Sequence, residues 1–575
     1  MTLSELQTSI KKHKLDAYII TRSNMFIGQD VLDEENPLLK LTGFSGSAGT
    51  LVVTPNKTFL LVDGRYEIQA ARQTDKELVE VICGKGNLLS LCLGKLFKDK
   101  KAKVGFNSLT NAVQNIEVLE RFFPNLSFIT DDSAIFENNL CGKPCQVFEH
   151  KLEFCGIDRN EKIGNISKLI ALNGCDAYLF TAADSVSWLL NLRSNALPDT
   201  PLLRAYALLD KDGRVALFGD GLNFETEPTD FSVEPLGNLH KRLKSFKNKT
   251  IGFDTQTTPY YCLSLFEKNK ITQRRLIDFC QEAKAEKNPV EISGIEAAHL
   301  RDGVALIRFL IWLEKHNKNT TELDIVQKLH DFRAKGKNYW SESFGTIAAF
   351  AENGAVVHYQ PTAESNQKLT NDSLLLLDSG AQYFDGTTDI TRTLAIGTPS
   401  PEMCENFTLV LKAHIALASQ KFINGTSGVA LDKIARAPLW NEGKDYKHGT
   451  GHGVGCFLNV HEGPQNMGMQ SSKLPIKENM ILSVEPGYYK EGAYGIRIEN
   501  LVRVVKSDLS DDNNDFLEFK ILTLCPIDKQ LINKYLLSEK ELSWLNNYHR
   551  EVYEKLSPLL NDAEQDWLRN ACSPL

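Results

Sequence analysis

Two stretches near the start of the chain share one order of hydrophobic and polar positions. LDAYIITRSN (residues 15–24) and CDAYLFTAAD (175–184) are strand-like runs, and each follows a helix-like amphipathic segment. A stretch of apolar or alternating positions around a short polar turn comes after each run, at 50–66 and 204–220. Such a pattern predicts a β-hairpin. We therefore expect two related α/β domains, at residues 1–148 and 149–286.

The pattern changes at Pro289, which opens a long amphipathic helix. A second helix follows, with Thr320 or Thr321 as its N-terminal cap. GTIAAF and AVVHY then read as strands, and residues 373–397 read as a strong hairpin.

The same order of helix, helix and hairpin recurs later in the chain. The second copy has helices in 400–422 and 426–443 and a hairpin in 480–505. This repeat predicts an internally duplicated α+β domain at about 287–508. A polar patch then leads to a helical tail, from about residue 509, that completes a third domain of 287–575. The predicted fold class is therefore a multidomain α/β and α+β protein.

The composition of the chain limits the classes of function that we expect for the protein. The chain has 575 residues, too many for a single core, with 42% hydrophobic and 24% charged residues. Its net charge of -8 gives no electrostatic support for a nucleic-acid partner. No apolar stretch approaches the ~20 residues that cross a bilayer, and the first residues lack a secretory pattern. We expect no membrane partner.

The twelve cysteines are scattered along the chain. Without a secretory signal they favour free thiols and a cytoplasmic location. Cys141 and Cys145 have a C-x3-C spacing that could begin a zinc site. No second Cys/His pair follows at a suitable spacing, which argues against that site.

Five candidate metal ligands lie in the duplicated domain. Asp378 and Asp389 occupy the two arms of the first hairpin. A turn centred between Tyr383 and Phe384 would place these aspartates opposite each other, with Cβ atoms ~5 Å apart. Glu485 and Glu499 are related in the same way about Gly492 in the second hairpin, and the fifth candidate is a histidine of KHGTGHGVG, His448 or His452.

Four buried carboxylates could not stay ionised together without cations. Oxygen ligands with one imidazole suit two ions of manganese, cobalt or zinc. Taken singly, each acidic residue has an ordinary interpretation as a turn or strand-end residue, and HGTGHGVG could be a phosphate loop. That loop lacks the following Lys-Ser/Thr, and the symmetric positions in both repeats favour a metal centre.

Three strings resemble a known family. LLDSGAQYFDGTTDITRT, HGTGHGVGCFLNVHEGP and SVEPGYYKEGAYGIRIEN are similar to the creatinase/methionine-aminopeptidase superfamily of metallopeptidases. The whole chain resembles most closely the three-domain, cytosolic-type aminopeptidase P, an Xaa-Pro aminopeptidase, through GFSGSAGT, VDGRY, WLLNLR, AKAEKNPVE and WLNNYH. The resemblance implies two creatinase-N-like α/β domains followed by a pita-bread catalytic domain.

The resemblance also implies roles for particular residues. The metal ligands would be Asp378, Asp389, His452, Glu485 and Glu499. Asp389 and Glu499 would bridge two divalent ions, with manganese favoured and cobalt or zinc as alternatives. The other implied roles are catalytic for His358, His461 and Glu485, and substrate-binding for Arg65, His448 and Arg497.

Departures from the family pattern lie outside the expected metal centre. SNMFIGQDVLDEEN stands where the family shows an acidic run with His and Glu-Tyr, and Asp199-Thr200-Pro201 replaces Asn-x-Pro. Ala205-Tyr206 replaces Ser-Tyr. These changes bear on substrate entry and on peptide length.

The expected activity is removal of an N-terminal residue that precedes proline, from peptides with proline in second position. One alternative is a prolidase that cleaves only Xaa-Pro dipeptides, and another is a catalytically silent peptide-binding protein of the same fold. The resemblance further implies a homodimer through the catalytic domain, with Trp440 near the contact.

Overall fold

The computed structural model describes residues 2–131, 143–370, 372–470, 474–511 and 514–575. The chain divides into two compact units, which we describe separately. Unit 1 comprises residues 1–150, 157–197 and 201–281, and unit 2 comprises 151–156, 198–200 and 282–575. The division into domains at 148/149 and 286/287 stays a prediction.

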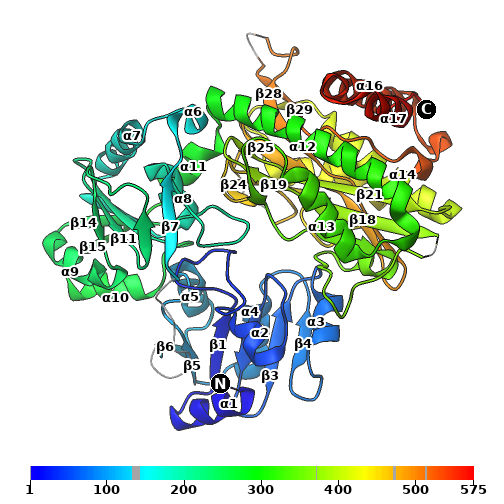
Figure 1. Ribbon diagram of the computed structural model, residues 1–575. Helices are drawn as coiled ribbons and strands as arrows, with labels where there is room; N and C mark the ends of the chain where they lie inside the picture. Colours follow the sequence, from blue (N-terminus) through cyan, green and yellow to red (C-terminus); the bar gives the residue numbers. More distant parts are fainter. Residues whose placement is uncertain (1, 132–142, 371, 471–473, 512–513) are drawn as a thin grey trace. The chain divides into compact units, whose positions relative to one another are not determined.

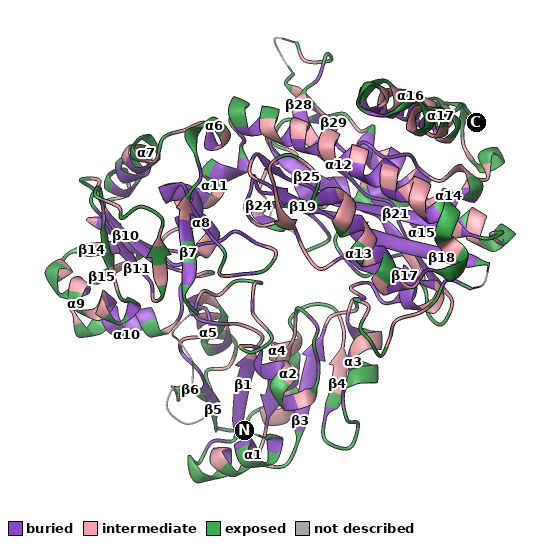
Figure 2. Cartoon of the chain, in the orientation of Figure 1, coloured by how far each residue is buried: buried purple, intermediate pink, exposed green. Residues whose placement is uncertain are grey.

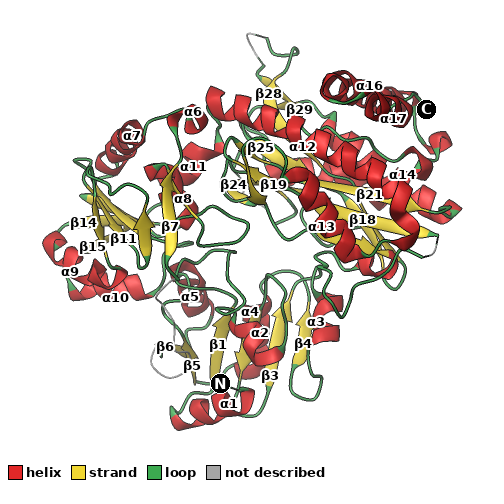
Figure 3. Ribbon diagram, viewed as in Figure 1, coloured by secondary structure: helices red, strands yellow, loops and turns green. Residues whose placement is uncertain are grey.

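Unit 1 contains two six-stranded sheets with one strand order. The first sheet has the order β4-β3-β2-β1-β5-β6 and the second β13-β11-β10-β8-β14-β15. In both, the first strand pairs antiparallel with a hairpin on one side and parallel with a later strand on the other. The predicted internal relationship is thus visible in the sheet topology, which Figure 3 shows in yellow. The strands are β1 (Ala17–Thr21), β2 (Thr50–Val53), β3 (Thr58–Val62), β4 (Glu80–Cys83), β5 (Ala102–Phe106), β6 (Leu126–Thr130), β8 (Ala177–Phe180), β10 (Tyr206–Asp210), β11 (Val215–Phe218), β13 (Ser232–Glu234), β14 (Thr250–Phe253) and β15 (Thr272–Arg275).

The helices that precede the two first strands each have a side-chain cap at the N-terminus. Thr2 caps α1 (Leu3–Lys12) in a reciprocal capping box with Glu5, and Asp158 caps α7 (Arg159–Leu172). The predicted hairpins are β2–β3 and β10–β11, both antiparallel.

Unit 2 begins with two helices that cover a sheet. Asn288 caps α12 (Pro289–His316), with Pro289 in its first turn, and Thr321 caps α13 (Glu322–Arg333). Their apolar faces pack on the sheet β17-β18-β21, which Figure 1 shows behind them. The central strand β18 is buried along its whole length (Figure 2). The strands are β17 (Ile347–Phe350), β18 (Ser373–Ser379) and β21 (Ile390–Ile396).

The second copy in unit 2 builds a six-stranded sheet of order β22-β29-β28-β25-β23-β24. Apolar side chains of α15 pack on this sheet. A separate antiparallel pair, β26–β27, extends the second hairpin. The elements are α14 (Pro401–Ala418), α15 (Gly428–Asn441), β22 (Phe422–Ile423), β23 (Gly451–Gly453), β24 (Glu462–Met467), β25 (Ile481–Val484), β26 (Gly487–Lys490), β27 (Tyr494–Arg497), β28 (Asn500–Lys506) and β29 (Phe516–Ile521).

Two expectations about elements in unit 2 are wrong. AVVHY is no strand, because residues 351–355 form a 3-10 helix and the chain then turns at Val357 and His358. The segment after the polar patch begins with β29, which pairs antiparallel with β28 in the second sheet. The helical part of the tail starts later, with α16 (Glu539–Leu556) and α17 (Asp562–Ala571).

The described cysteines are free thiols, as expected. Cys145 is buried on β7 (Cys145–Glu149), whereas Cys141 lies outside the described residues. Within the described part of the chain, none of the helices has the length and apolar character that crossing a membrane requires.

Candidate metal centre

The first hairpin places Asp378 and Asp389 on one face of the sheet. The residue opposite Asp378 lies two positions further along the chain than predicted. Asp378, on β18, pairs with Thr391 of β21. The turn is therefore centred between Phe384 and Asp385, one residue later than predicted. Asp385 fixes this turn, because its carboxylate accepts hydrogen bonds from Arg301 and, at 3.1 Å, from Asn338 Nδ2. Asp389 is consequently a diagonal neighbour of Asp378.

The second hairpin has the register that the sequence predicts. Val484 pairs with Asn500 across β25 and β28, and Gly487 pairs with Arg497 across β26 and β27. Glu485 and Glu499 thus lie at opposite positions between these pairs. The hairpin reverses about Gly492, whose φ of 70° is a conformation that glycine adopts without strain.

His452 extends from β23 toward both hairpins. Its Nε2 atom lies 3.4 Å from Asp389 Oδ2 and 3.6 Å from Glu485 Oε1. Its Nδ1 atom donates a hydrogen bond to the carbonyl of Gly453 at 2.9 Å, which directs Nε2 at the carboxylates. One ligand atom each of Asp389, His452 and Glu499 lies within 4.8 Å of the others.

Burial makes this group of carboxylates electrostatically demanding. Burial and the neighbouring Asp378 raise the pKa of Asp389 to about 6, against the hydrogen bond from His452. Burial raises the pKa of Glu485 to about 7, and it raises the pKa of Glu499 well above its usual range. Although burial opposes its charge, His452 has its pKa raised to about 9 by Asp389 and Glu485. Without cations, the group would have to take up protons.

The residues fit a pair of divalent cations. Four carboxylates and one imidazole converge from both halves of the repeat, and Arg497 contacts one of the carboxylates, with Nη2 2.5 Å from Asp378 Oδ2. Asp378 Oδ1 is buried and has no hydrogen-bond partner among the described residues. A buried carboxylate oxygen without a donor is costly unless a cation contacts it. Oxygen-rich donors with one imidazole suit manganese, cobalt or zinc.

His448 and Arg497 are joined by a residue that the sequence did not suggest. Tyr489 OH contacts His448 Nε2 at 2.8 Å and accepts a hydrogen bond from Arg497 Nη1 at 2.7 Å. His448 Nδ1 lies 3.9 Å from Glu485 Oε2. A chain of contacts therefore runs from His448 through Tyr489 and Arg497 to Asp378. The alternation of side chains along the hairpin puts Tyr489 on the same face as Arg497, and this pattern could have indicated Tyr489 from the sequence.

Thr391 is a second residue that the sequence analysis missed. Its hydroxyl donates to Glu499 Oε2 at 2.7 Å and accepts from Arg497 Nε at 3.1 Å. Thr391 follows Asp389 by two positions in TDITRT, so both side chains share one face of the strand.

The two histidines with implied catalytic roles lie on loops of unit 2. His461 is exposed, and its ring lies 4.3 Å from the ring of His452, at 90° to it. His358 is half-buried in the turn after residues 351–355. The preceding carbonyl, of Val357, accepts a hydrogen bond from Arg497 Nη1 at 3.4 Å.

Arg65 belongs to unit 1, on the turn after β3. Its guanidinium pairs with Asp63 at 2.7 Å and lies over the ring of Tyr66. The implied contact of Arg65 with a peptide stays a prediction.

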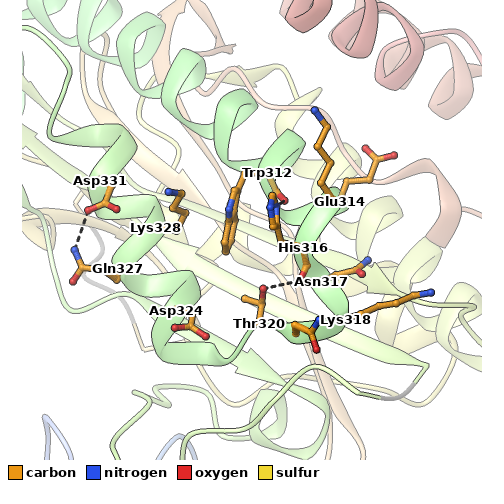
Figure 4. A pocket seen from close by; sticks show the side chains of 12 residues that line it. Trp312, Glu314, His316, Asn317, Lys318, Thr320, Asp324, Gln327, Lys328 and Asp331 are labelled. Atoms are coloured by element: carbon orange, nitrogen blue, oxygen red, sulfur yellow. Dashed lines mark hydrogen bonds between the residues drawn. The ribbon is translucent and has the colours of Figure 1, made fainter.

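A surface hollow of about 710 Å³ lies where α12 ends and α13 begins. The rings of Trp312 and His316 stack in it, and Gln327 donates to Asp331 (Figure 4). None of the predicted site residues lines this hollow. The hairpins, rather than this hollow, therefore hold the candidate chemistry.

Comparison with known families defines the class of the chain. The family described as metallopeptidase family M24 matches residues 293–506, and the C-terminal region of peptidase M24 matches 515–575. Two creatinase/prolidase N-terminal domains match residues 3–136 and 143–291. The chain thus has the fold class expected of it, with two creatinase-N-like domains and a pita-bread metallopeptidase domain.

Full-length relatives narrow the class. A probable Xaa-Pro aminopeptidase P of Laccaria bicolor is 34% identical over 100% of this chain and 93% of its own length. Aminopeptidase P2 of Arabidopsis thaliana is 34% identical over 98% of this chain and 86% of its own length. The crystal structure of X-prolyl aminopeptidase from Caenorhabditis elegans, a cytosolic enzyme with a di-nuclear active site, matches with a TM-score of 0.91 at 32% identity, covering 98% of this chain and 95% of that one. The chain belongs to the three-domain aminopeptidase P family of Xaa-Pro aminopeptidases.

Proposed function

We propose that this protein hydrolyses the peptide bond between an N-terminal residue and a following proline. The observation that carries the proposal is the convergence of Asp389, His452 and Glu499 from both halves of the repeat, within 4.8 Å of one another. Membership in the aminopeptidase P family supports the choice of substrate.

The proposed ligands divide between two ions. Asp389 and Glu499 would contact both ions, Asp378 would complete one site, and His452 with Glu485 would complete the other. Asp378 Oδ1, which has no hydrogen-bond partner among the described residues, and the raised pKa values of the other carboxylates support the binding of cations here. Manganese is the proposed metal, with cobalt or zinc as alternatives.

Bonds before proline need unusual help, because the leaving nitrogen belongs to a rigid ring and carries no N–H. Divalent ions held by these residues would lower the pKa of a water molecule and polarise the scissile carbonyl. Glu485 carries a proton to the proline nitrogen, which must be protonated in order to leave. His461 and His358 donate hydrogen bonds to the oxygen on which negative charge develops.

Substrate binding is assigned to the residues around this centre. Through Tyr489, His448 and Arg497 form one hydrogen-bonded chain that holds Asp378 in place. Arg65, from the first N-terminal domain, is proposed to contact the peptide. The free amino group of the substrate would lie beside the metal ligands, so that one residue would be removed at a time.

A prolidase with the same metal ligands is the nearest alternative function. Such an enzyme cleaves only Xaa-Pro dipeptides. The decisive experiment compares hydrolysis of a tripeptide Xaa-Pro-Yaa with that of the dipeptide Xaa-Pro, with manganese added. Cleavage of the tripeptide supports the proposal, and cleavage of the dipeptide alone contradicts it.

A catalytically silent peptide-binding protein is the other alternative. Relatives of that kind lose metal ligands, whereas all five candidates are present in this chain. Analysis of bound metal on the purified protein separates the two functions.

We also propose that the protein is a cytoplasmic homodimer that associates through its catalytic domain.

A further inference from the structure

Glu462, the residue after His461, is buried between two lysines. Its Oε1 atom lies 2.5 Å from Lys287 Nζ, and its Oε2 atom lies 3.3 Å from Lys284 Nζ. The three side chains are between 0% and 1% exposed. Burying three ionised groups is expensive unless each is well paired, so a plain apolar contact would hold these segments together at lower cost. The cluster therefore calls for a role beyond stability.

The two lysines also bind backbone on both sides of the cluster. Lys287 Nζ donates to the carbonyl of Lys284 at 2.7 Å. Lys284 Nζ donates to the carbonyl of Gly463 at 3.1 Å. The carboxylate of Glu462 and the carbonyl of Gly463 are thus both fixed to the segment that precedes α12. This arrangement anchors the backbone immediately after His461.

Glu462 also packs against the strand that carries the metal ligand His452. Glu462 is the strand partner of Gly453. A Cβ atom on Gly453 would lie 2.3 Å from the carbonyl oxygen of Glu462, and one on Gly455 would lie 3.1 Å from Glu462 Oε2. The glycines of GHGVG therefore allow Glu462 to approach this strand closely.

His461 itself has an exposed side chain, with its ring 4.3 Å from that of His452. The direction of this ring depends on the backbone at residues 461–463, from which the side chain extends. That backbone is held by Glu462, Lys287 and Lys284.

We propose that Glu462, held by Lys287 and Lys284, is a positioning residue for His461. The inference rests on the proposed function, in which His461 donates to the developing oxyanion. The cluster holds His461 at a fixed place beside His452 and so acts on turnover through that histidine. Supporting residues of this kind typically change activity by about 10- to 100-fold when replaced.

The test is a double-mutant cycle of Glu462→Gln and His461→Ala, assayed on Xaa-Pro-Yaa with manganese. Glutamine keeps the shape of the side chain and an acceptor for Lys287. Glu462→Gln alone should lower kcat about 10- to 100-fold. It should leave KM, bound metal per chain and the unfolding temperature near the parent values. In the His461→Ala background the same change should alter kcat less than about twofold, because its effect passes through the missing ring.

The matched control is Glu286→Gln, which removes an ion pair of half-exposed side chains one residue from Lys287. Glu286 pairs with Lys477 at 2.7 Å, and it should be replaceable without effect. If Glu462→Gln destabilises the fold, Lys287→Met combined with Glu462→Gln removes one charge of each sign and takes its place in the cycle.

Four results overturn the inference. The first is unchanged kcat in Glu462→Gln. The second is an equal loss of kcat with and without His461, which would indicate a structural ion cluster and leave the proposed function intact. The third is full activity of His461→Ala, which would also refute the role of His461. An inactive parent enzyme, loaded with metal, would overturn the proposed function and this inference together.

Discussion

Single residues of the candidate centre are distinguished by what surrounds them rather than by their type. Asp378, Asp389, Glu485 and Glu499 are all acidic, but Arg497 contacts Asp378 and His452 contacts Asp389 and Glu485. Glu499 accepts its hydrogen bond from Thr391. These different partners are consistent with the different coordination roles proposed for the four residues.

Replacement of either histidine with a proposed catalytic role, His358 or His461, should slow turnover without loss of bound metal. His358→Ala and His461→Ala should each lower kcat by ~10²–10³-fold, the usual effect of losing one preorganised oxyanion donor. Metal content should stay near that of the parent. The measurements are tripeptide hydrolysis and metal analysis, with His240→Ala in unit 1 as a control. Near-normal activity would refute the assigned role, and loss of metal would identify a ligand or its support.

At the residue scale, the sequence identified the proposed ligands but not the hydroxyls around them. Acidic residues in symmetric positions of two hairpins form a recognisable pattern, and the strings that carry them resemble a family. Thr391 and Tyr489 contribute hydroxyls whose contacts depend on the strand register and on the packing of two hairpins. A shift of one residue at the turn, as occurred at Asp385, changes every cross-strand partner.

Among the elements, α13 begins with a carboxylate that organises the loop next to His358. Glu322 accepts hydrogen bonds from the backbone of Phe350 and Gln367 and from the side chains of Asn353 and Tyr359, at 2.8 to 3.0 Å. Its replacement leaves these buried donors without an acceptor.

Glu322→Ala should therefore destabilise unit 2 by about 3 kcal/mol, the cost of unsatisfied buried polar groups. Chemical denaturation measures the change. Glu364→Ala, an exposed glutamate of the same loop, is the control and should stay within about 0.5 kcal/mol of the parent. Equal stability of the two variants would show that the Glu322 network contributes little.

The tail helix α16 carries a histidine that is buried in neutral form. His549 Nε2 accepts a hydrogen bond from the backbone N–H of Ile527 at 3.1 Å. Burial, with Lys529 and Arg392 nearby, lowers the pKa of His549 to about 3. The unfolded chain, with a pKa near 6.5, takes up the proton first as the pH falls.

The stabilising contribution of neutral His549 should thus be complete above pH ~6.5 and decline as the pH falls toward 3, by at most ~1.4 kcal/mol per pH unit. His549→Gln removes this dependence while keeping a polar side chain. Urea unfolding at pH 5 and pH 7.5 compares the parent with the variant. The same loss of stability in both proteins would mean that His549 is not responsible.

Element by element, runs of apolar or alternating positions were a sound guide to the hairpins. The hairpins at β2–β3, β10–β11 and β25–β28 follow their patterns. The expectation for AVVHY was wrong because the segment ends a 3-10 helix and then turns, with Tyr359 hydrogen-bonded to Glu322 instead of extending a sheet. The strand β29 was missed because the polar patch before it reads as the end of a domain, although β28 and β29 pair antiparallel in one sheet.

At the scale of the whole molecule, duplication occurs twice. Two sheets of one strand order form unit 1, and two helix–helix–hairpin copies form unit 2. The proposed centre lies where the two helix–helix–hairpin repeats within unit 2 meet. The first repeat contributes Asp378 and Asp389, and the second contributes His452, Glu485 and Glu499.

Association of two chains is the first prediction at this scale. Trp440, at the end of α15, is 42% exposed, which is a large aromatic surface for a solvent-facing position. We expect sedimentation to show a dimer at micromolar concentration, and Trp440→Glu to weaken it, because a charge replaces an aromatic anchor. A stable monomer of the parent protein at that concentration would refute the dimer.

The central claim is that two metal ions, bridged by Asp389 and Glu499, are required for activity. Each of these two residues comes from a different repeat of unit 2. Loss of either should therefore weaken the binding of both ions and leave the remaining carboxylates repelling one another.

The most direct test measures bound metal and tripeptide hydrolysis in Asp389→Ala, Glu499→Ala and Cys456→Ala. Cys456 is buried close to His452 in sequence and controls for thiol chemistry. We predict that both bridge variants stay folded, bind fewer than two metal ions per chain and lose activity, while Cys456→Ala remains active. Full activity in either bridge variant would contradict the dinuclear account.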